Sequence, residues 1–196
     1  MPAPRGGGAS GPRIVAGQLG GRRIAAPKGV TTRPTSERVR EALFNSLARF
    51  VDLEGCRFAD LYAGSGAVGI EALSRGAAHV TFVESDPRTA RLLRSNLTAL
   101  SVADAARVVV SSVTAAVAAA APEPYDVVFA DPPYQLPGEE LSVVLRRLVS
   151  GGWIAPDGVV VVERATRSGA LEWVPGLTGS QSRRYGETTL WYGRPS

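Results

Sequence analysis

The segment Asp131-Pro132-Pro133-Tyr134 combines residue types that could hold a planar amine during a reaction. Two successive prolines fix φ twice and remove two backbone donors, so the nearby carbonyls and the Asp131 carboxylate can face one cleft as acceptors. Tyr134 adds a flat aromatic face. Two hydrogen bonds donated by an exocyclic amine would aim its lone pair at an electrophile, and such alignment can be worth about 7–11 kcal/mol of barrier. The plainer reading of these residues is a turn after a strand.

A second group of residues, Asp60–Gly69 (DLYAGSGAVG), is typical of a strand, a glycine turn and the start of a helix. Glycines let a ligand approach the backbone closely, and the helix N-terminus favours a polar or anionic group. Glu84 closes the next predicted strand, where a carboxylate can accept both hydroxyls of a ribose. This pattern predicts an adenosine-type cofactor, although NAD and a purely structural turn remain compatible with it.

The elements that must position these residues alternate between strand-like and helix-like runs from position 57 onwards. Repeated β–α units predict a parallel sheet with helices on both faces, and Asp131 then lies at the carboxyl edge of the sheet, where open α/β folds bind ligands. The predicted strands are 58–62, 80–84, 107–110, 126–130, 158–162 and 187–192, and the predicted helices are 69–75, 88–100, 114–121 and 139–148.

The N-terminal quarter predicts two further elements. Arg13–Ala16 and Arg22–Ala25 flank Leu19-Gly20-Gly21, which is a β-hairpin pattern. Thr35 or Ser36 can cap a helix whose apolar stripe is Val39, Leu43, Leu47 and Phe50. Arg38 and Arg40 lie off this stripe, which favours a surface position for both.

Composition and charge narrow the class of protein. The chain has 196 residues, 44% of them hydrophobic and 20% charged, which excludes a disordered or fibrous protein. Cys56 is the single cysteine, so no internal disulfide and no cysteine metal cluster are expected. With no apolar run long enough to span a membrane and no signal-peptide core, we expect a cytoplasmic protein.

The net charge of +4 is unevenly distributed along the chain. Residues 1–50 carry nine basic and two acidic side chains, whereas residues 51–196 carry 13 basic and 16 acidic ones. A cationic segment joined to a mildly anionic body indicates a protein that docks a polyanion, although a solvated arginine-rich face is the alternative.

Taken together, Asp60–Gly69, Glu84 and Asp131–Tyr134 resemble the motifs of S-adenosylmethionine-dependent amino-methyltransferases with a Rossmann-like core. Two further stretches, Arg13–Arg23 and Thr32–Asn45, are similar to the N-terminal signature of the RsmD family of bacterial 16S rRNA guanine-N2 methyltransferases. Arg184–Glu187 followed by a strand resembles the C-terminus of that family. The resemblance covers about residues 13–192.

The resemblance implies a class I methyltransferase fold over residues 35–196, with a mostly parallel seven-stranded sheet and an antiparallel C-terminal strand. It also implies a basic hairpin and loop at 13–34, after a flexible tail at 1–12. The implied reaction transfers a methyl group to guanine 966 of 16S rRNA, in the small subunit or a late assembly intermediate. We expect a monomer and no metal.

Residue roles implied by the resemblance follow the positions of the motifs. The catalytic residues would be Asp131, Pro132, Pro133 and Tyr134, with Asp131 and Pro132 on the guanine amine and Tyr134 stacked on the base. The cofactor set would be Asp60, Tyr62, Ala63, Gly64, Gly66, Gly69, Glu84, Ser112 and Val113, where many relatives carry an acid near Ser112. The RNA-binding set would be Arg13, Arg22, Arg23, Lys28, Arg33, Arg38 and Arg40.

Three other functions stay open at this point. A DNA adenine-N6 methyltransferase would use the same chemistry, but only about 60 residues follow Tyr134, which leaves little room for a target-recognition domain. A nucleotide-binding RNA-assembly factor without turnover would not need Asp131. A nicotinamide oxidoreductase would leave Asp131–Tyr134 unexplained.

Overall fold

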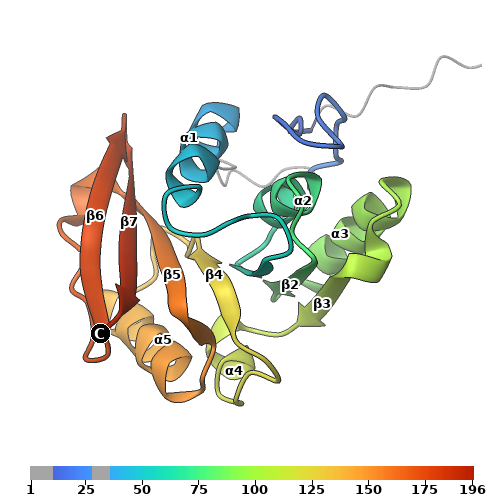
Figure 1. Ribbon diagram of the computed structural model, residues 1–196. Coiled ribbons are helices and arrows are strands. Elements are labelled where there is room, and N and C mark those ends of the chain that lie inside the picture. The colour runs from blue at the N-terminus through green and yellow to red at the C-terminus, as the bar shows by residue number, and fades with distance from the viewer. Residues whose placement is uncertain (1–10, 28–35) are drawn as a thin grey trace, which may run out of the picture.

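The computed structural model, which describes residues 11–27 and 36–196, contains a seven-stranded sheet in the order β3-β2-β1-β4-β5-β7-β6 (Figure 1). Strands β1 to β5 pair in parallel, and β7 is antiparallel to both of its neighbours. The strands are β1 Arg57–Leu61, β2 His79–Glu84, β3 Ala106–Val110, β4 Tyr125–Ala130, β5 Ile154–Ala165, β6 Leu177–Tyr185 and β7 Thr188–Pro195. The mostly parallel sheet with an antiparallel C-terminal strand is therefore confirmed.

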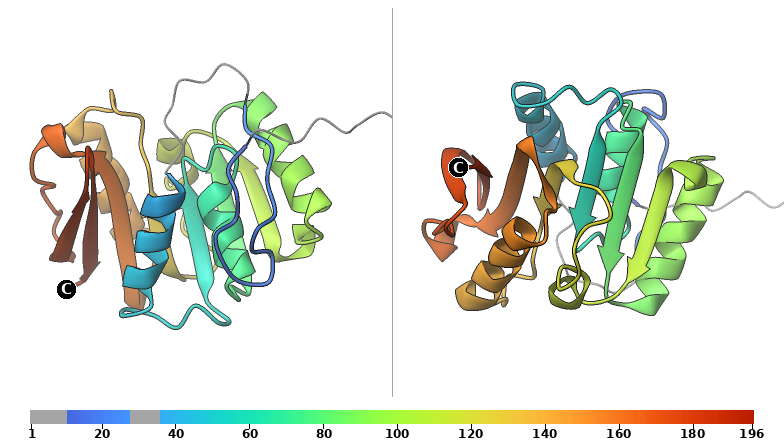
Figure 2. Two further views of the ribbon diagram at one scale, coloured as in Figure 1. Left: turned by 90° about the horizontal axis from the view of Figure 1, so that it is seen from above. Right: turned by 60° about the horizontal axis from the view of Figure 1, so that its bottom comes forward.

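Helices cover both faces of this sheet, as predicted, and make a three-layer molecule (Figure 2). One core packs α1, α2 and α3 against one face, and a second core packs α4 and α5 against the other. The helices are α1 Glu37–Leu47, α2 Ala67–Ser74, α3 Pro87–Ala99, α4 Val113–Ala116 and α5 Gly138–Ser150, with short 3₁₀ turns η1 Ala103–Ala105 and η2 Thr166–Ser168.

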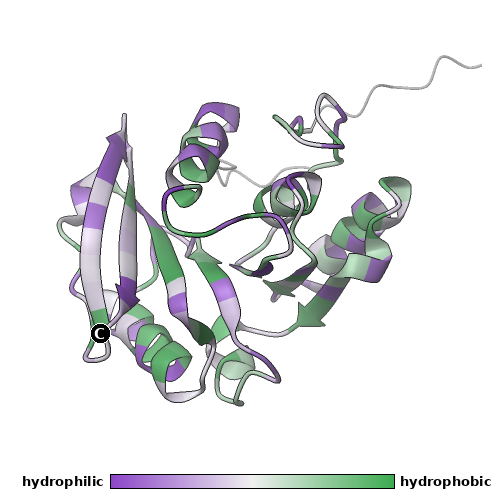
Figure 3. Cartoon of the chain, viewed as in Figure 1, coloured by the Kyte–Doolittle hydropathy of each residue, from purple (hydrophilic) through white to green (hydrophobic). Residues whose placement is uncertain are grey.

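The strands of the sheet centre carry buried apolar runs, such as Val159–Val162 of β5, with polar residues between or beside them, whereas β6 at the edge is largely polar (Figure 3). A strand buried on both faces reads as a continuous run of Val, Ile and Phe. Within the described residues, no helix has the length and apolarity that crossing a membrane requires.

Helix α1 forms as its sequence predicts. Ser36 is the N-cap, and its hydroxyl accepts a hydrogen bond from the Val39 backbone N–H at 3.3 Å. Val39, Leu43 and Leu47 are buried in the core. Phe50 lies beyond the helix end and stacks on Tyr192 of β7, with ring centroids 5.5 Å apart. The chain then continues to β1, which begins at Arg57.

Residues 11–27 form the predicted hairpin, here called the N-terminal hairpin, although its two arms pair only briefly. Arg13 and Arg23 make an isolated antiparallel bridge, and the Ile14 N–H donates to the Arg22 carbonyl at 2.8 Å. The Ile24 N–H donates to the carbonyl of Pro12 at 3.0 Å, so the last two residues of the predicted tail belong to the hairpin. Residues 1–10 of that tail lie outside the described residues.

Candidate active site

The predicted site residues meet at the carboxyl edge of the sheet. Leu61 of β1 is in register with Val83 of β2 on one side and with Ala130 of β4 on the other. The residues that follow, Tyr62 and Asp131, together with Glu84 at the end of β2, therefore lie side by side at this edge. The structure thus brings together the glycine turn, the ribose-type acid and the Asp131–Tyr134 segment, which are far apart in the sequence.

The glycine turn between β1 and α2 has the expected geometry. Gly64 and Gly66 have φ values of +55° and +84°. Residues other than glycine rarely adopt this backbone region. A Cβ on Gly66 would lie 2.2 Å from Cδ1 of Leu93, so the turn also packs closely on α3. Gly66 is the N-cap of α2 and offers no side-chain cap, which leaves the positive end of this helix facing the turn.

Asp60 does not line the ligand side of this turn, contrary to the prediction. Its side chain is 1% exposed, and Oδ2 accepts a hydrogen bond from the Gly69 backbone N–H at 2.9 Å. Burial raises the pKa of Asp60 to about 8, and the nearby negative charge of Glu84 adds to the shift. Asp60 therefore supports the turn from inside the core.

Gly69 is likewise a packing position. A Cβ there would lie 2.3 Å from the ring of Phe82, so only glycine lets α2 lie this close to β2. Its backbone N–H is used by the bond to Asp60, and its predicted contact with the cofactor stays a prediction.

Glu84 is held in place with part of its surface exposed. Oε2 accepts from the Gly64 N–H at 2.9 Å, and Oε1 accepts from the Asp86 N–H at 2.7 Å. An ionised carboxylate has about four acceptor positions, so these two bonds orient the group and leave capacity for ligand hydroxyls.

The segment after β3 lies beside Glu84. The Ser111 N–H donates to the Glu84 carbonyl at 3.1 Å, and the exposed Ser112 caps α4 by accepting from the Ala115 N–H at 3.2 Å. Val113 is 4% exposed and points into the core, so of the two predicted residues Ser112 is the one at the surface.

The Asp131–Tyr134 segment leaves β4 as a turn that presents its aromatic ring outward. Asp131 is partly exposed, Pro132 is buried and Pro133 is exposed. Tyr134 is 50% exposed, which is unusual for a large hydrophobic residue of this chain. The Leu136 N–H donates to the Pro133 carbonyl at 2.8 Å and closes the turn.

Tyr62, the first residue after β1, has an uncommon backbone conformation. Its φ is +65°, and strained residues of this kind cluster at functional sites. The ring packs against the core on the α4–α5 face. Burial, together with the negative charge of Glu140, raises the pKa of the Tyr62 hydroxyl to about 12, so it is a neutral hydrogen-bonding group.

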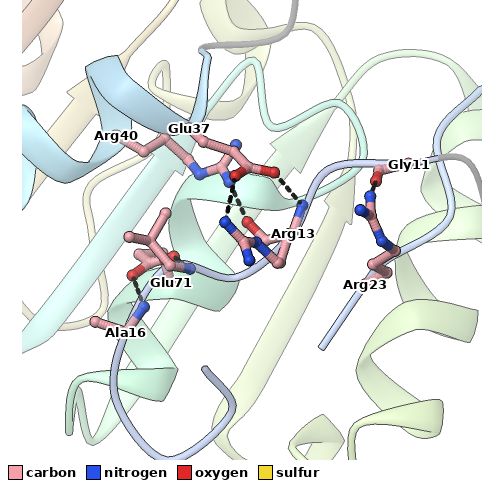
Figure 4. A network of polar contacts seen from close by, with 8 residues as sticks. Gly11, Arg13, Ala16, Arg23, Glu37, Arg40 and Glu71 are labelled. Atoms are coloured by element: carbon pink, nitrogen blue, oxygen red, sulfur yellow. Dashed lines mark hydrogen bonds and ion pairs between the residues drawn. The ribbon is translucent and has the colours of Figure 1, made fainter. Parts of the chain in front are cut away.

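Three of the predicted RNA-binding arginines, Arg13, Arg22 and Arg23, lie on the N-terminal hairpin and are exposed; Figure 4 shows the contacts of Arg13 and Arg23. Arg13 forms an ion pair with Glu37 of α1 at 3.2 Å, and Arg23 donates to the Gly11 carbonyl at 3.1 Å. Arg22 donates to the Ala99 carbonyl at the end of α3 at 2.8 Å, which places it at the amino edge of the sheet. Arg38 of α1 is exposed, whereas Lys28 and Arg33 lie outside the described residues.

The expected RNA contact by Arg40 is wrong. This side chain is 1% exposed and donates to the Arg13 carbonyl from between α1 and the hairpin (Figure 4). Burial lowers the pKa of Arg40, while the charges of Glu71 and Glu37 oppose that shift. The helical period alone could not show that the hairpin covers this part of α1.

Residues that fasten the hairpin to the body were missed from the sequence. Glu71 is fully buried in α2, and its carboxylate accepts from the Val15 N–H at 2.7 Å and the Ala16 N–H at 3.0 Å. Ser74 and Asn96 also bond to hairpin backbone. The one sequence signal for these residues was the acid inside the apolar run AVGIEALS. Burying a carboxylate is costly unless its charge is paired.

The comparisons with known proteins agree with this arrangement. The family model described as Conserved hypothetical protein 95, which represents the RsmD family, matches residues 12–194. The chain belongs to the RsmD family. Ribosomal RNA small subunit methyltransferase D of Escherichia coli is 38% identical over 89% of this chain and 85% of its own. YlbH of Bacillus subtilis is 35% identical over 90% of this chain and 95% of its own.

A solved structure of a protein described as a methyltransferase has the same fold. The yhhF protein of Escherichia coli superimposes with a TM-score of 0.83 at 33% identity, over 94% of this chain and 98% of its own. Fold and relatives together identify the chain as a class I methyltransferase.

Proposed function

We propose that this RsmD-family chain transfers a methyl group from S-adenosylmethionine to the exocyclic N2 amine of guanine 966 in 16S rRNA. The observation that carries the proposal is the placement of Asp131–Tyr134 at the carboxyl edge, level with the glycine turn and Glu84. The name of the Escherichia coli relative, which specifies the small subunit rRNA, supports the choice of substrate. The protein would act in the cytoplasm as a monomer, on the small subunit or a late assembly intermediate.

The residues of the turn fit the proposed cofactor. Glu84 is positioned by two backbone N–H groups and can accept the ribose hydroxyls. The uncapped start of α2 at Gly66 suits the methionine carboxylate, because helix N-termini bind anions. Ser112 would border the adenine ring. When bound, S-adenosylmethionine supplies a methyl group on a positively charged sulfur.

The Asp131–Tyr134 segment would hold the base. The Asp131 carboxylate and the Pro132 carbonyl accept hydrogen bonds from the guanine N2 amine, and the exposed Tyr134 ring stacks on the base. The N2 lone pair forms the new N–C bond as the methyl–sulfur bond breaks and its electron pair stays on sulfur. The amine proton then leaves to Asp131 or to water. The guanine must first leave its stack, which costs a few kcal/mol and least in a loop.

Asp131→Ala tests this function directly. We expect the variant to lose methyl transfer and to keep binding S-adenosylhomocysteine, because Asp131 would contact the base and not the cofactor. The measurement is transfer of labelled methyl to small subunits from a strain that lacks the endogenous enzyme, with naked rRNA and duplex DNA in parallel. The matched control is Asp104→Ala, which replaces an exposed aspartate of η1.

The location of the label separates the possible functions. Label in guanine N2 of 16S rRNA with the wild-type chain, absent with Asp131→Ala, supports the proposal. Label confined to DNA would identify a DNA methyltransferase instead. Near-normal turnover by Asp131→Ala would exclude the assigned role of this residue.

A further inference from the structure

The N-terminal hairpin is bonded to three helices, and two of them, α2 and α3, also shape the cofactor turn. The backbone bridge between Arg13 and Arg23 is internal to the hairpin. Helix α1 holds the hairpin at Arg13, through Glu37 and Arg40. Further bonds come from α2, which begins at the glycine turn, and from α3, which packs on that turn through Leu93.

Asn96 of α3 makes the most direct connection. Its side chain is 5% exposed, and Oδ1 accepts from the Ala25 N–H at 2.9 Å. Its Nδ2 donates to the Ala25 carbonyl at 3.0 Å and to the Ser65 carbonyl at 3.1 Å. Ser65 lies between Gly64 and Gly66, so one buried amide joins the hairpin to the centre of the cofactor turn.

The orientation of this amide is fully determined by its partners. A primary amide has two N–H donors and one carbonyl acceptor, and Asn96 uses both donors and the acceptor. Turning the amide over would bring Oδ1 against carbonyl oxygens. The position of the Ser65 carbonyl therefore influences how well Asn96 can bond to both backbone groups of Ala25.

Helix α2 adds a second connection in the same direction. Glu71 bonds to Val15 and Ala16, and the Ser74 hydroxyl accepts from the Leu19 N–H at 2.9 Å. The Gln18 N–H donates to the Ser74 carbonyl at 2.7 Å. The helix whose first residue follows Gly66 thus holds the first arm and the turn of the hairpin, from Val15 to Leu19.

We propose that Asn96 is a positioning residue that couples occupation of the cofactor turn to the order of the N-terminal hairpin. A ligand on the turn fixes the Ser65 carbonyl, which in turn fixes the Asn96 amide and strengthens its bonds to Ala25. Coupling between two sites is reciprocal, so an ordered hairpin must favour the ligand by the same factor. The identities of the ligand and of the RNA held by the hairpin rest on the proposed function.

The functional consequence concerns the order of binding. The loaded enzyme would present a more rigid basic hairpin than the empty one, and therefore would bind polyanions more tightly. We expect a factor of about five- to tenfold, at the lower end of typical coupling between sites.

Hydrogen exchange of the full chain tests the coupling without RNA, with S-adenosylhomocysteine as the probe. We expect saturating probe to slow exchange of the Ala25, Val15 and Ala16 amides about fivefold in the wild-type chain. In Asn96→Ala the hairpin should exchange faster, and the response to the probe should be lost while calorimetry still shows binding. A purely structural role would accelerate exchange equally with and without the probe, so the difference between the two conditions decides.

A second variant tests the reverse direction without altering Asn96. Gly17 has a φ of +80°, and a Cβ there would lie 1.8 Å from the Ser74 carbonyl oxygen, so Gly17→Ala should push the hairpin off α2. We expect its affinity for S-adenosylhomocysteine to fall about fivefold, although Gly17 is remote from the turn. Gly21→Ala is the matched control, because Gly21 also has a positive φ but its Cβ would meet nothing within 4 Å.

The outcomes are distinct. Loss of the exchange response in Asn96→Ala together with the weaker probe binding of Gly17→Ala supports the coupling. An unchanged response in Asn96→Ala, or wild-type affinity in Gly17→Ala, overturns it while leaving the proposed function intact. A wild-type chain that does not bind the probe overturns the proposed function, and this inference with it.

Discussion

Asp60 has the residue type and position of a ligand-binding acid, yet it works as a neutral support inside the core. Its pKa of about 8 means that the folded chain keeps the carboxyl protonated at neutral pH. The sequence shows an acid at the end of a strand, next to a glycine turn. It does not show which of the groups at that edge face the solvent, because burial depends on the packing of α2 on β2.

Asp60 should therefore make stability depend on pH. Between its unfolded pKa of about 4 and its folded pKa of about 8, the folded chain binds one proton more than the unfolded chain, so stability falls as pH rises. Asp60→Asn keeps an acceptor for the Gly69 N–H and cannot ionise. The difference in unfolding free energy, variant minus wild type, should therefore increase by about 1 kcal/mol or more between pH 4 and pH 8. Urea denaturation at the two pH values measures it.

The exposed Asp104→Asn serves as the control for this comparison. Its free-energy difference from the wild-type chain should not rise over the same pH range. A constant difference for Asp60→Asn as well would contradict a protonated Asp60 in the core.

Arg40 and Glu71 show the same limit of sequence reasoning at the residue scale. The glycines, Glu84 and Asp131–Tyr134 could be placed at one edge from strand order alone. The burial of Arg40 and Glu71 could not be predicted in this way. Their environment is created by the hairpin, which comes from a distant part of the chain.

Among the elements, the glycine turn offers a matched test of backbone strain against packing. Gly64 and Gly66 both have positive φ, but a Cβ on Gly64 meets nothing within 4 Å, whereas one on Gly66 meets Leu93. We expect Gly64→Ala to cost about 1–2 kcal/mol of unfolding free energy from strain alone. Gly66→Ala should cost about 2–5 kcal/mol, because crowding of a packed core adds about 1–3 kcal/mol.

Urea denaturation of the two variants side by side measures this difference. Equal losses would mean that Leu93 moves aside freely, and the turn would then be less closely packed than the structure shows.

Most elements could be predicted from the sequence because their apolar residues recur at the spacing of a helix or form the short apolar run of a buried strand. Strands β2, β4 and β5 contain β-branched and aromatic runs, and α1, α3 and α5 begin and end within a few residues of expectation. Strand β6 was missed because LTGSQSRRY is mostly exposed and has little apolar alternation. Helix α4 is shorter than predicted because the Ala121 N–H and the Ala119 carbonyl bond to the region around Trp153.

For the whole molecule, the described positive charge of the hairpin lies around the bridge between its two arms, which carries Arg13, Arg22 and Arg23. The side chains reach different helices, because Arg13 pairs with Glu37 at the start of α1 while Arg22 bonds to Ala99 at the end of α3. The charge imbalance could be predicted from the sequence, but its placement required the contacts with α2 and α3.

Replacing Arg22 and Arg23 by Gln should weaken RNA binding and flatten its dependence on salt. If each arginine neutralises one phosphate, the slope of log affinity against log salt should become shallower by about 1.4, given about 0.7 per phosphate of single-stranded RNA. Affinity for S-adenosylhomocysteine should fall much less than in Gly17→Ala, because the bonds of Asn96 and Glu71 to the hairpin are kept.

The matched control replaces Arg107 and Arg146, which are exposed on β3 and α5, and should leave the slope nearly unchanged. An equal change of slope in the two double variants would mean that overall charge, and not the hairpin, attracts the RNA.

The position of β7 between β5 and β6 has a consequence for the newly made chain. During translation β6 leaves the ribosome first, and its partner in the sheet follows only with residues 188–195. Leu190 and Tyr192, which are fully buried, arrive with that strand. A nascent polypeptide stopped before Thr188 would expose unpaired edges on both β5 and β6, and such edges invite aggregation. Completion of the domain is therefore delayed until β7 has emerged, which makes prematurely terminated products targets for cellular quality control.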